Sequence, residues 1–105
     1  MSSIQIVNSR SEIGAGTRGA SLGIDALKIA SLRTKSNFFI DRDYVEVLNH
    51  NHLIFQSRKV IDKNAHNIDG LIELYEDFCK VLKNVYSEGN FPVILAGDHS
   101  SAAAV

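Results

Sequence analysis

The segment Phe91–Ser100, with the sequence FPVILAGDHS, decides how the rest of the chain is organised. Its first half is a short run of branched apolar residues behind a proline, which is typical of a buried parallel strand. Gly97 allows a sharp turn where that strand ends. Asp98, His99 and Ser100 are then expected at the carboxyl rim of a sheet, where open α/β sheets bind ligands. The segment therefore predicts a strand, a turn with a candidate metal or catalytic site, and a helix beginning near residue 101.

Length and composition indicate one small globular unit. The chain has 105 residues and a formal net charge of −1, which gives no reason to expect a nucleic-acid or membrane partner. No apolar run approaches the roughly 18–20 residues that span a bilayer, and the amino terminus does not resemble a signal peptide. A single cysteine, Cys79, permits no internal disulfide. We therefore expect a cytoplasmic protein.

Strand and helix signals alternate along the chain. Residues 4–7 are β-branched and predict a first strand, and residues 44–48 predict a second one. Residues 38–40 are either a short extension of the sheet or a packed loop. A helix is expected between the first two strands, with Ser21 as its N-cap and its end near Arg33. The order strand, helix, strand, helix, strand predicts parallel pairing with right-handed crossovers.

The clearest helix signal lies between residues 68 and 85. Its apolar residues recur at positions i, i+3, i+4 and i+7, the spacing of an amphipathic helix. They are Ile68, Leu71, Ile72, Tyr75, Phe78, Cys79, Leu82 and Val85. Gly89 is expected as the C-cap. Because Cys79 lies on this stripe, we expect a buried, inert thiol there.

Two short motifs have weaker alternatives. The spacing Gly14-x-Gly16-x-x-Gly19 matches a dinucleotide-binding pattern by letter, but no acidic residue closes a second strand at the expected offset. The triplet His50-Asn51-His52 has the residues that name a nuclease motif, but the further histidines of that motif are missing. A polar loop over residues 49–67 is the simpler interpretation of the triplet.

Two segments resemble the ureohydrolase family, which includes arginase, agmatinase and formimidoylglutamase. Residues 96–100, AGDHS, resemble the family's Gly-Gly-Asp-His-Ser motif. Residues 19–30, GASLGIDALKIA, are similar to its Gly-x-x-x-Gly-Pro-x-x-Leu-Arg-x-Ala motif. Ile24, Lys28 and Ala96 depart from these patterns without removing a metal ligand. The resemblance implies that residues 1–105 are the amino-terminal portion of a single arginase-like α/β domain.

The resemblance also implies a fold and a site. The fold would be a parallel three-layer α/β/α sheet of the arginase type, here only its first three strands and associated helices, with the first strand in the middle. His99 would be a ligand to one of two manganese ions. Asp98 would either hold the His99 ring as a hydrogen-bond acceptor or bond to the neighbouring backbone, and Ser100 would cap the following helix. No other catalytic or cofactor-binding residue is assigned.

The implied activity is hydrolysis of a C–N bond in a small, linear guanidino or amidino substrate, most simply arginine to ornithine and urea. The family's remaining ligands come from later motifs. The segment Asn64–Asp69 echoes one of them, but its first carboxylate is an asparagine, its last is one position late, and it precedes His99. We therefore expect the 105-residue chain alone to be inactive.

An alternative is a catalytically inactive, stand-alone α/β module. Its unfinished sheet edge, at Phe91–Ala96, would recruit a partner or a second copy, so a homo-oligomer is expected. The chain stops at residues 103–105, AAV, inside a predicted helix with no terminating residue. This favours a truncated chain over a natural short product.

Overall fold

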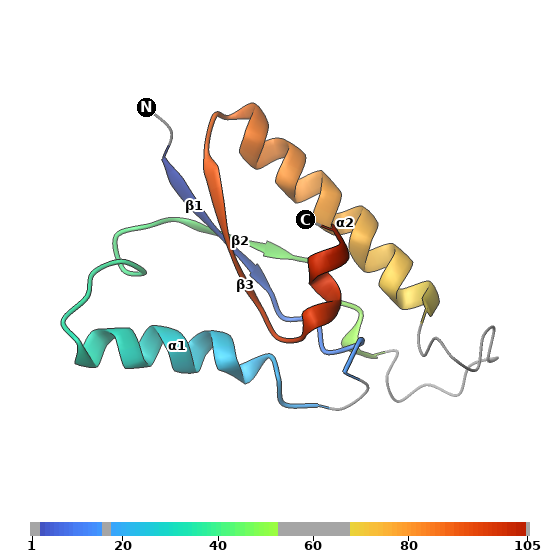
Figure 1. Ribbon diagram of the computed structural model, residues 1–105, viewed down its shortest axis with the longest axis horizontal. Helices are drawn as coiled ribbons and strands as arrows, with labels where there is room; N and C mark the ends of the chain where they lie inside the picture. The colour runs from blue at the N-terminus through green and yellow to red at the C-terminus, as the bar shows by residue number, and fades with distance from the viewer. Residues whose placement is uncertain (1–2, 16–17, 53–67, 105) are drawn as a thin grey trace.

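The computed structural model describes residues 3–15, 18–52 and 68–104 of the chain (Figure 1). Its elements are β1 (Ile4–Ser9), α1 (Leu22–Arg33), β2 (Tyr44–Val47), α2 (Ile68–Ser87), β3 (Phe91–Ala96) and the 3-10 helix η2 (His99–Ala104). The three strands form one sheet in the order β2-β1-β3, and both pairings are parallel. The predicted α/β fold, with the first strand in the middle, is confirmed.

The register of the sheet brings the carboxyl ends of all three strands together at the same end of the sheet. Ser9 at the end of β1 pairs with Val47 on one side and with Ala96 on the other. The connections that leave these strands therefore meet at the same rim, as expected for parallel strands. Figure 1 shows η2 and the loop after β1 gathered there, with α1 and α2 on opposite sides of the sheet.

Helix α2 supplies most of the core. Leu74, Phe78, Leu82 and Val85 are buried at helical spacing and form one cluster with Val7 of β1 and Val47 of β2. Each such side chain contributes roughly 1.5–3 kcal/mol when fully buried. The predicted helix is confirmed, but the prediction for Cys79 is wrong, because its thiol is exposed. The sheet meets the face centred on Phe78, and Cys79, one residue further along, points past it.

The apolar residues Leu22, Ala26, Ile29 and Ala30 form a stripe along one face of α1 at helical spacing, but all four are exposed. Ile24 is its one buried residue, whereas Leu22 and Ile29 are 68% and 59% exposed. The helix runs obliquely beside the sheet (Figure 1), and beyond Ile24 it reaches the strands through Lys28, whose Nζ lies 4.6 Å from the centroid of the Tyr44 ring in β2. Helical spacing identifies the apolar face of α1. The angle at which the helix leaves the preceding loop decides whether the sheet covers that face.

The connections agree with the sequence in most places. Gly89 adopts a left-handed conformation with φ of +75°, and the Asn90 N–H donates to the Val85 carbonyl at 3.1 Å, which closes α2 as predicted. Residues 38–40 form a turn, so the loop interpretation is correct there. Most of the expected polar loop, including the metal-motif echo up to residue 67, lies outside the described residues. No helix in the described ranges has the length and hydropathy needed to cross a membrane.

Candidate functional site

His99 lies at the carboxyl rim of the sheet, where the sequence places it. Strand β3 ends at Ala96, Gly97 and Asp98 form the turn, and His99 is the first residue of η2. Its side chain is exposed and makes no hydrogen bond or ion pair with the described part of the chain. The imidazole is therefore accessible to a ligand, and its position is set by the backbone that carries it.

Asp98 holds this turn together. Its Oδ1 accepts hydrogen bonds from the backbone N–H of Ser100, at 3.0 Å, and from the Ser100 hydroxyl. Its Oδ2 accepts one from the backbone N–H of Gly14, at 3.1 Å. Both oxygens are thus engaged by backbone and hydroxyl donors, and neither is bonded to His99 in the described part of the chain. The expectation that Ser100 caps the helix is wrong, because Asp98 takes that role and Ser100 is a donor to it.

Two glycines allow the loop after β1 to pack against this turn. A Cβ on Gly97 would lie 2.9 Å from the Ser11 carbonyl oxygen and 3.1 Å from the Ser21 nitrogen. A Cβ on Gly14 would lie 2.5 Å from the Cβ of Ser100. Since ordinary contacts need more than 3.4 Å, neither position has room for a side chain. The absence of these side chains is what brings residues 11–14 and 97–100 together.

A buried carboxylate organises the loop after β1. Glu12 is completely buried, and its Oε2 accepts hydrogen bonds from the backbone N–H groups of Gly19 and Ser21, the second at 2.9 Å. Arg18 forms an ion pair with Oε1, which has no hydrogen bond of good geometry. The bond from Ser21 is the largest of several contacts that lower the pKa of Glu12, while desolvation opposes them. The carboxyl group is therefore held in its charged form.

Asn51 anchors the same loop from the other side. Its Oδ1 accepts a hydrogen bond from the backbone N–H of Glu12 at 2.7 Å, and its Nδ2 donates to the Arg10 carbonyl at 2.8 Å. The neighbouring His50 has Nε2 3.0 Å from Asp77 and Nδ1 3.3 Å from Glu73. Two of the three residues in the His50-Asn51-His52 triplet thus have structural contacts. This favours the simpler interpretation, in which the triplet belongs to a polar loop.

A surface ion-pair group lies beside this loop. Arg10 contacts Asp25 of α1 through two parallel hydrogen bonds of 3.1 and 3.2 Å, and its Nε lies 3.4 Å from Glu46 of β2. The bonds from Arg10 lower the pKa of Asp25, and the same bonds raise the pKa of Arg10. These groups are well solvated, so their contribution to stability is small. They tie the start of α1 to the rim of the sheet.

The described residues do not gather a cluster of potential metal ligands around His99. No group of three or more histidine, cysteine or acidic side chains in the described ranges is arranged to hold a metal ion. His99 suits a single ligand position, because an exposed imidazole at a sheet rim is a good transition-metal donor. Divalent manganese also requires several oxygen ligands, and the oxygens of Asp98 are already engaged. The described residues therefore do not form a two-metal centre by themselves.

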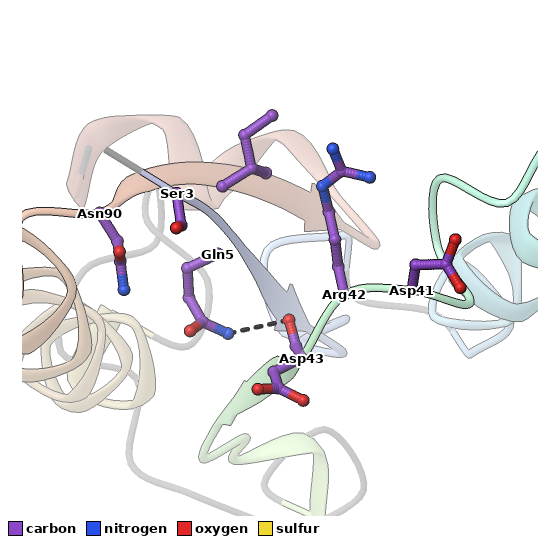
Figure 2. Close-up of a pocket in the computed structure, with 7 residues that line it drawn as sticks. Ser3, Gln5, Asp41, Arg42, Asp43 and Asn90 are labelled. Atoms are coloured by element: carbon purple, nitrogen blue, oxygen red, sulfur yellow. Dashed lines mark hydrogen bonds between the residues drawn. The ribbon is translucent and has the colours of Figure 1, made fainter. Parts of the chain in front are cut away.

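A hollow of about 740 Å³ lies at the opposite end of the sheet, where the strands begin (Figure 2). It is lined by residues 3–5, residues 41–43 and Asn90, and Gln5 bridges it by donating to the Asp43 carbonyl at 2.9 Å. The side chains of Asp41, Arg42 and Asp43 point in different directions in Figure 2. Arg42 stacks over the Phe38 ring, 4.2 Å from its centroid. Because these charges do not converge on a common point, the hollow has no candidate chemistry.

The fold and the position of His99 define a class of protein: an open parallel α/β sheet with a histidine-bearing turn after the half-buried strand β3. The comparison with solved structures supports that class. Arginase from Bacillus subtilis aligns with 97% of this chain at a TM-score of 0.66 and 21% identity, and arginase from Bacillus caldovelox with 100% at 0.69 and 21%. The matches cover 33% and 36% of those chains. At this identity they establish the fold.

The sequence comparison is more specific. An arginase from Brevibacillus brevis is 30% identical in an alignment of 104 residues that covers 94% of this chain. The alignment confirms the resemblance to the ureohydrolase family that the two motifs indicated. No protein-family model matches the chain. The chain spans about a third of the length of this relative (33%).

Sequence reasoning found His99 and Asp98 but missed Glu12, Arg18 and Asn51. Glu12 stands in a loop of small and polar residues, where a glutamate is ordinarily solvated. The local pattern carries no sign of burial. The one available signal is the pair of glycines at 14 and 19, which permits the backbone to wrap around a side chain between them.

Proposed function

We propose that this chain is part of a manganese-dependent hydrolase that cleaves a guanidinium C–N bond, most simply in arginine to give ornithine and urea. The observation that carries the proposal is the sequence similarity to an arginase along nearly the whole chain. Within that similarity, His99 keeps an exposed imidazole at the rim where α/β sheets bind ligands. Agmatine and other small amidines are alternative substrates with the same reacting group.

His99 would act as a metal ligand through a neutral ring nitrogen. Asp98 would act indirectly, by fixing the backbone from which His99 projects. Two bound manganese ions would supply an activated water and would stabilise the charge that develops on the substrate. The remaining ligands and the substrate-binding groups would come from outside the described residues. The proposal includes a cytoplasmic homo-oligomer, as the sequence led us to expect.

The test is urea release from arginine, with and without manganese, by the natural gene product. His99→Asn should lower the rate by more than the roughly 10–100-fold that follows loss of a residue supporting a metal ligand. His52→Asn is the matched control, because His52 is also an exposed histidine and no metal-ligand role is proposed for it. It should keep full activity. Equal activity of wild type and His99→Asn would refute the role proposed for His99.

A second candidate function is favoured by the free edge of β3. Within the described residues, β3 pairs with β1 and with no strand on its other side. An uncovered edge strand offers unpaired backbone groups to another chain. A non-catalytic module that pairs through this edge is therefore the alternative. Absence of urea release by the natural gene product, together with a stable self-associated species, would support it.

A further inference from the structure

Glu12 is the only charged side chain that is buried in the described part of the molecule. A buried carboxylate is costly unless charged partners and hydrogen bonds compensate for the lost water. Here the compensation comes from Arg18 and from the N–H groups of Gly19 and Ser21. All three lie in the same short loop, so the carboxylate determines how that loop folds back on itself.

The loop that Glu12 organises is one wall of the turn before His99. Two residues leave no room for a Cβ at position 97. One is Ser21, whose N–H donates to Glu12, and the other is Ser11, which directly precedes Glu12 in the sequence. The N–H of Gly97 also donates to the Ser9 carbonyl at 3.1 Å. A change in the path of residues 18–21 would therefore remove part of the surface against which Gly97 packs.

The same loop also contacts the residues on the other side of Gly97. Gly14, two residues after Glu12, donates to Asp98 at 3.1 Å and lies against Ser100. Tyr75 of α2 holds the far side of this turn, with its hydroxyl donating to the Ser100 carbonyl at 3.0 Å. His99 itself has no side-chain partner among the described residues. Its imidazole can be positioned only through these flanking contacts.

We infer that Glu12 is a positioning residue for His99: its carboxylate fixes the loop after β1, and that loop fixes the turn from which the imidazole projects. The inference rests on the proposed function only in treating His99 as a metal ligand. The mechanical coupling between Glu12 and the turn is independent of that role. The two parts can therefore be tested separately.

Amide hydrogen exchange in the metal-free natural gene product tests the coupling. Glu12→Gln keeps the size of the side chain and removes its charge, so the bonds to Ser21 and Gly19 weaken. We expect the Gly97 and Ser100 amides to exchange about 10-fold faster or more, while the Val7 amide in β1 changes little. Val85→Ala is the matched control, because it loosens the core at the other end of α2 and should not single out the turn.

Faster exchange at Gly97 and Ser100 beyond any change at Val7 would support the inference. Exchange that is unchanged at the turn, or that rises equally at all three amides as in Val85→Ala, would overturn it. If Glu12→Gln does not fold, Arg18→Gln replaces it. Arg18 is exposed, and its loss removes one of the partners that hold the Glu12 carboxylate. The expected acceleration at the turn is then about two- to fivefold.

Manganese affinity, measured by calorimetry, tests whether the coupling acts through His99. We expect Glu12→Gln to weaken binding about 10-fold in the wild-type background and to have no further effect when His99→Asn is present. Equal weakening in both backgrounds would overturn a role through His99. If His99→Asn alone leaves the manganese affinity unchanged, His99 is not a metal ligand, and Glu12 then does not position one. The hydrogen-exchange measurement still tests the coupling between Glu12 and the turn in that case.

Discussion

Gly97 and Gly23 are in opposite surroundings, although both stand near the candidate site in sequence motifs of the same family. A side chain at position 97 would collide with backbone atoms of Ser11 and Ser21, whereas a Cβ at position 23 meets nothing within 4 Å. Motif similarity alone does not distinguish them. The difference arises because the loop after β1 packs against the turn after β3, whereas Gly23 lies on the exposed side of α1.

Substitution of these glycines should have opposite effects on stability. Gly97→Ala forces the turn or the loop to move and should cost about 1–3 kcal/mol of unfolding free energy. Gly23→Ala replaces a glycine inside a helix with the best helix former and should stabilise by about 0.5–1 kcal/mol. Thermal or denaturant unfolding of both variants measures the difference. A neutral Gly97→Ala would show that the turn is free to shift.

Glu12 should also make stability depend on pH. Its hydrogen bond from Ser21, the largest cause, holds the pKa of the folded carboxyl below its unfolded value of about 4.3. A depressed folded pKa means that the stabilisation is fully present above the unfolded pKa and is lost as pH falls through the folded pKa. Acid unfolding of wild type and Glu12→Gln should therefore converge at low pH. Curves that stay parallel from pH 7 to pH 3 would contradict this.

At the scale of elements, α2 and α1 show how differently an amphipathic pattern can be used. The stripe of α2 reaches the cluster with Val7 and Val47 through Phe78, Leu82 and Val85. Its packing differs from the predicted stripe in detail, because Ile72 and Cys79 are exposed whereas Leu74 is fully buried. The stripe of α1 is largely exposed in the described structure. The periodicity of apolar residues indicates that a helix has an apolar side. Whether another element covers that side depends on the loop geometry and on the neighbouring layers.

Neighbouring positions on α2 should therefore respond unequally to truncation. Phe78 is fully buried at the centre of the cluster, and Phe78→Ala should cost about 3–5 kcal/mol. Cys79 is exposed, and Cys79→Ala should change stability by less than about 0.5 kcal/mol. Chemical denaturation measures both. A large loss from Cys79→Ala would show that the thiol is buried in solution, as the sequence stripe had suggested.

At the scale of the whole molecule, β3 has a half-buried apolar sequence, and among the described residues no strand pairs with its outer edge. An edge of this kind associates readily with another strand. We expect the isolated 105-residue chain to self-associate above micromolar concentration, as measured by light scattering or crosslinking. A well-folded monomer throughout that range would refute pairing through β3. A lysine in place of Phe91, whose ring is 61% exposed, should reduce the association.

The sequence by itself determined the order of the elements, the parallel pairing of the strands, the long helix α2 with its glycine C-cap, and the position of His99 after β3. These features follow from apolar periodicity, β-branched runs and turn residues, which act over a few neighbouring positions. The family resemblance rested on two motifs of the same local kind.

Only the tertiary structure decided the burial of Glu12, the exposure of Cys79 and of the α1 stripe, and the direction of the Asp98 carboxylate. Each of these depends on contacts between segments far apart in sequence. Asp98 bonds to Gly14 across 84 positions, and Glu12 is held by Asn51 across 39. Local patterns carry no information about such distant partners, because the sheet register and the loop path that bring them together form only when the whole chain has folded.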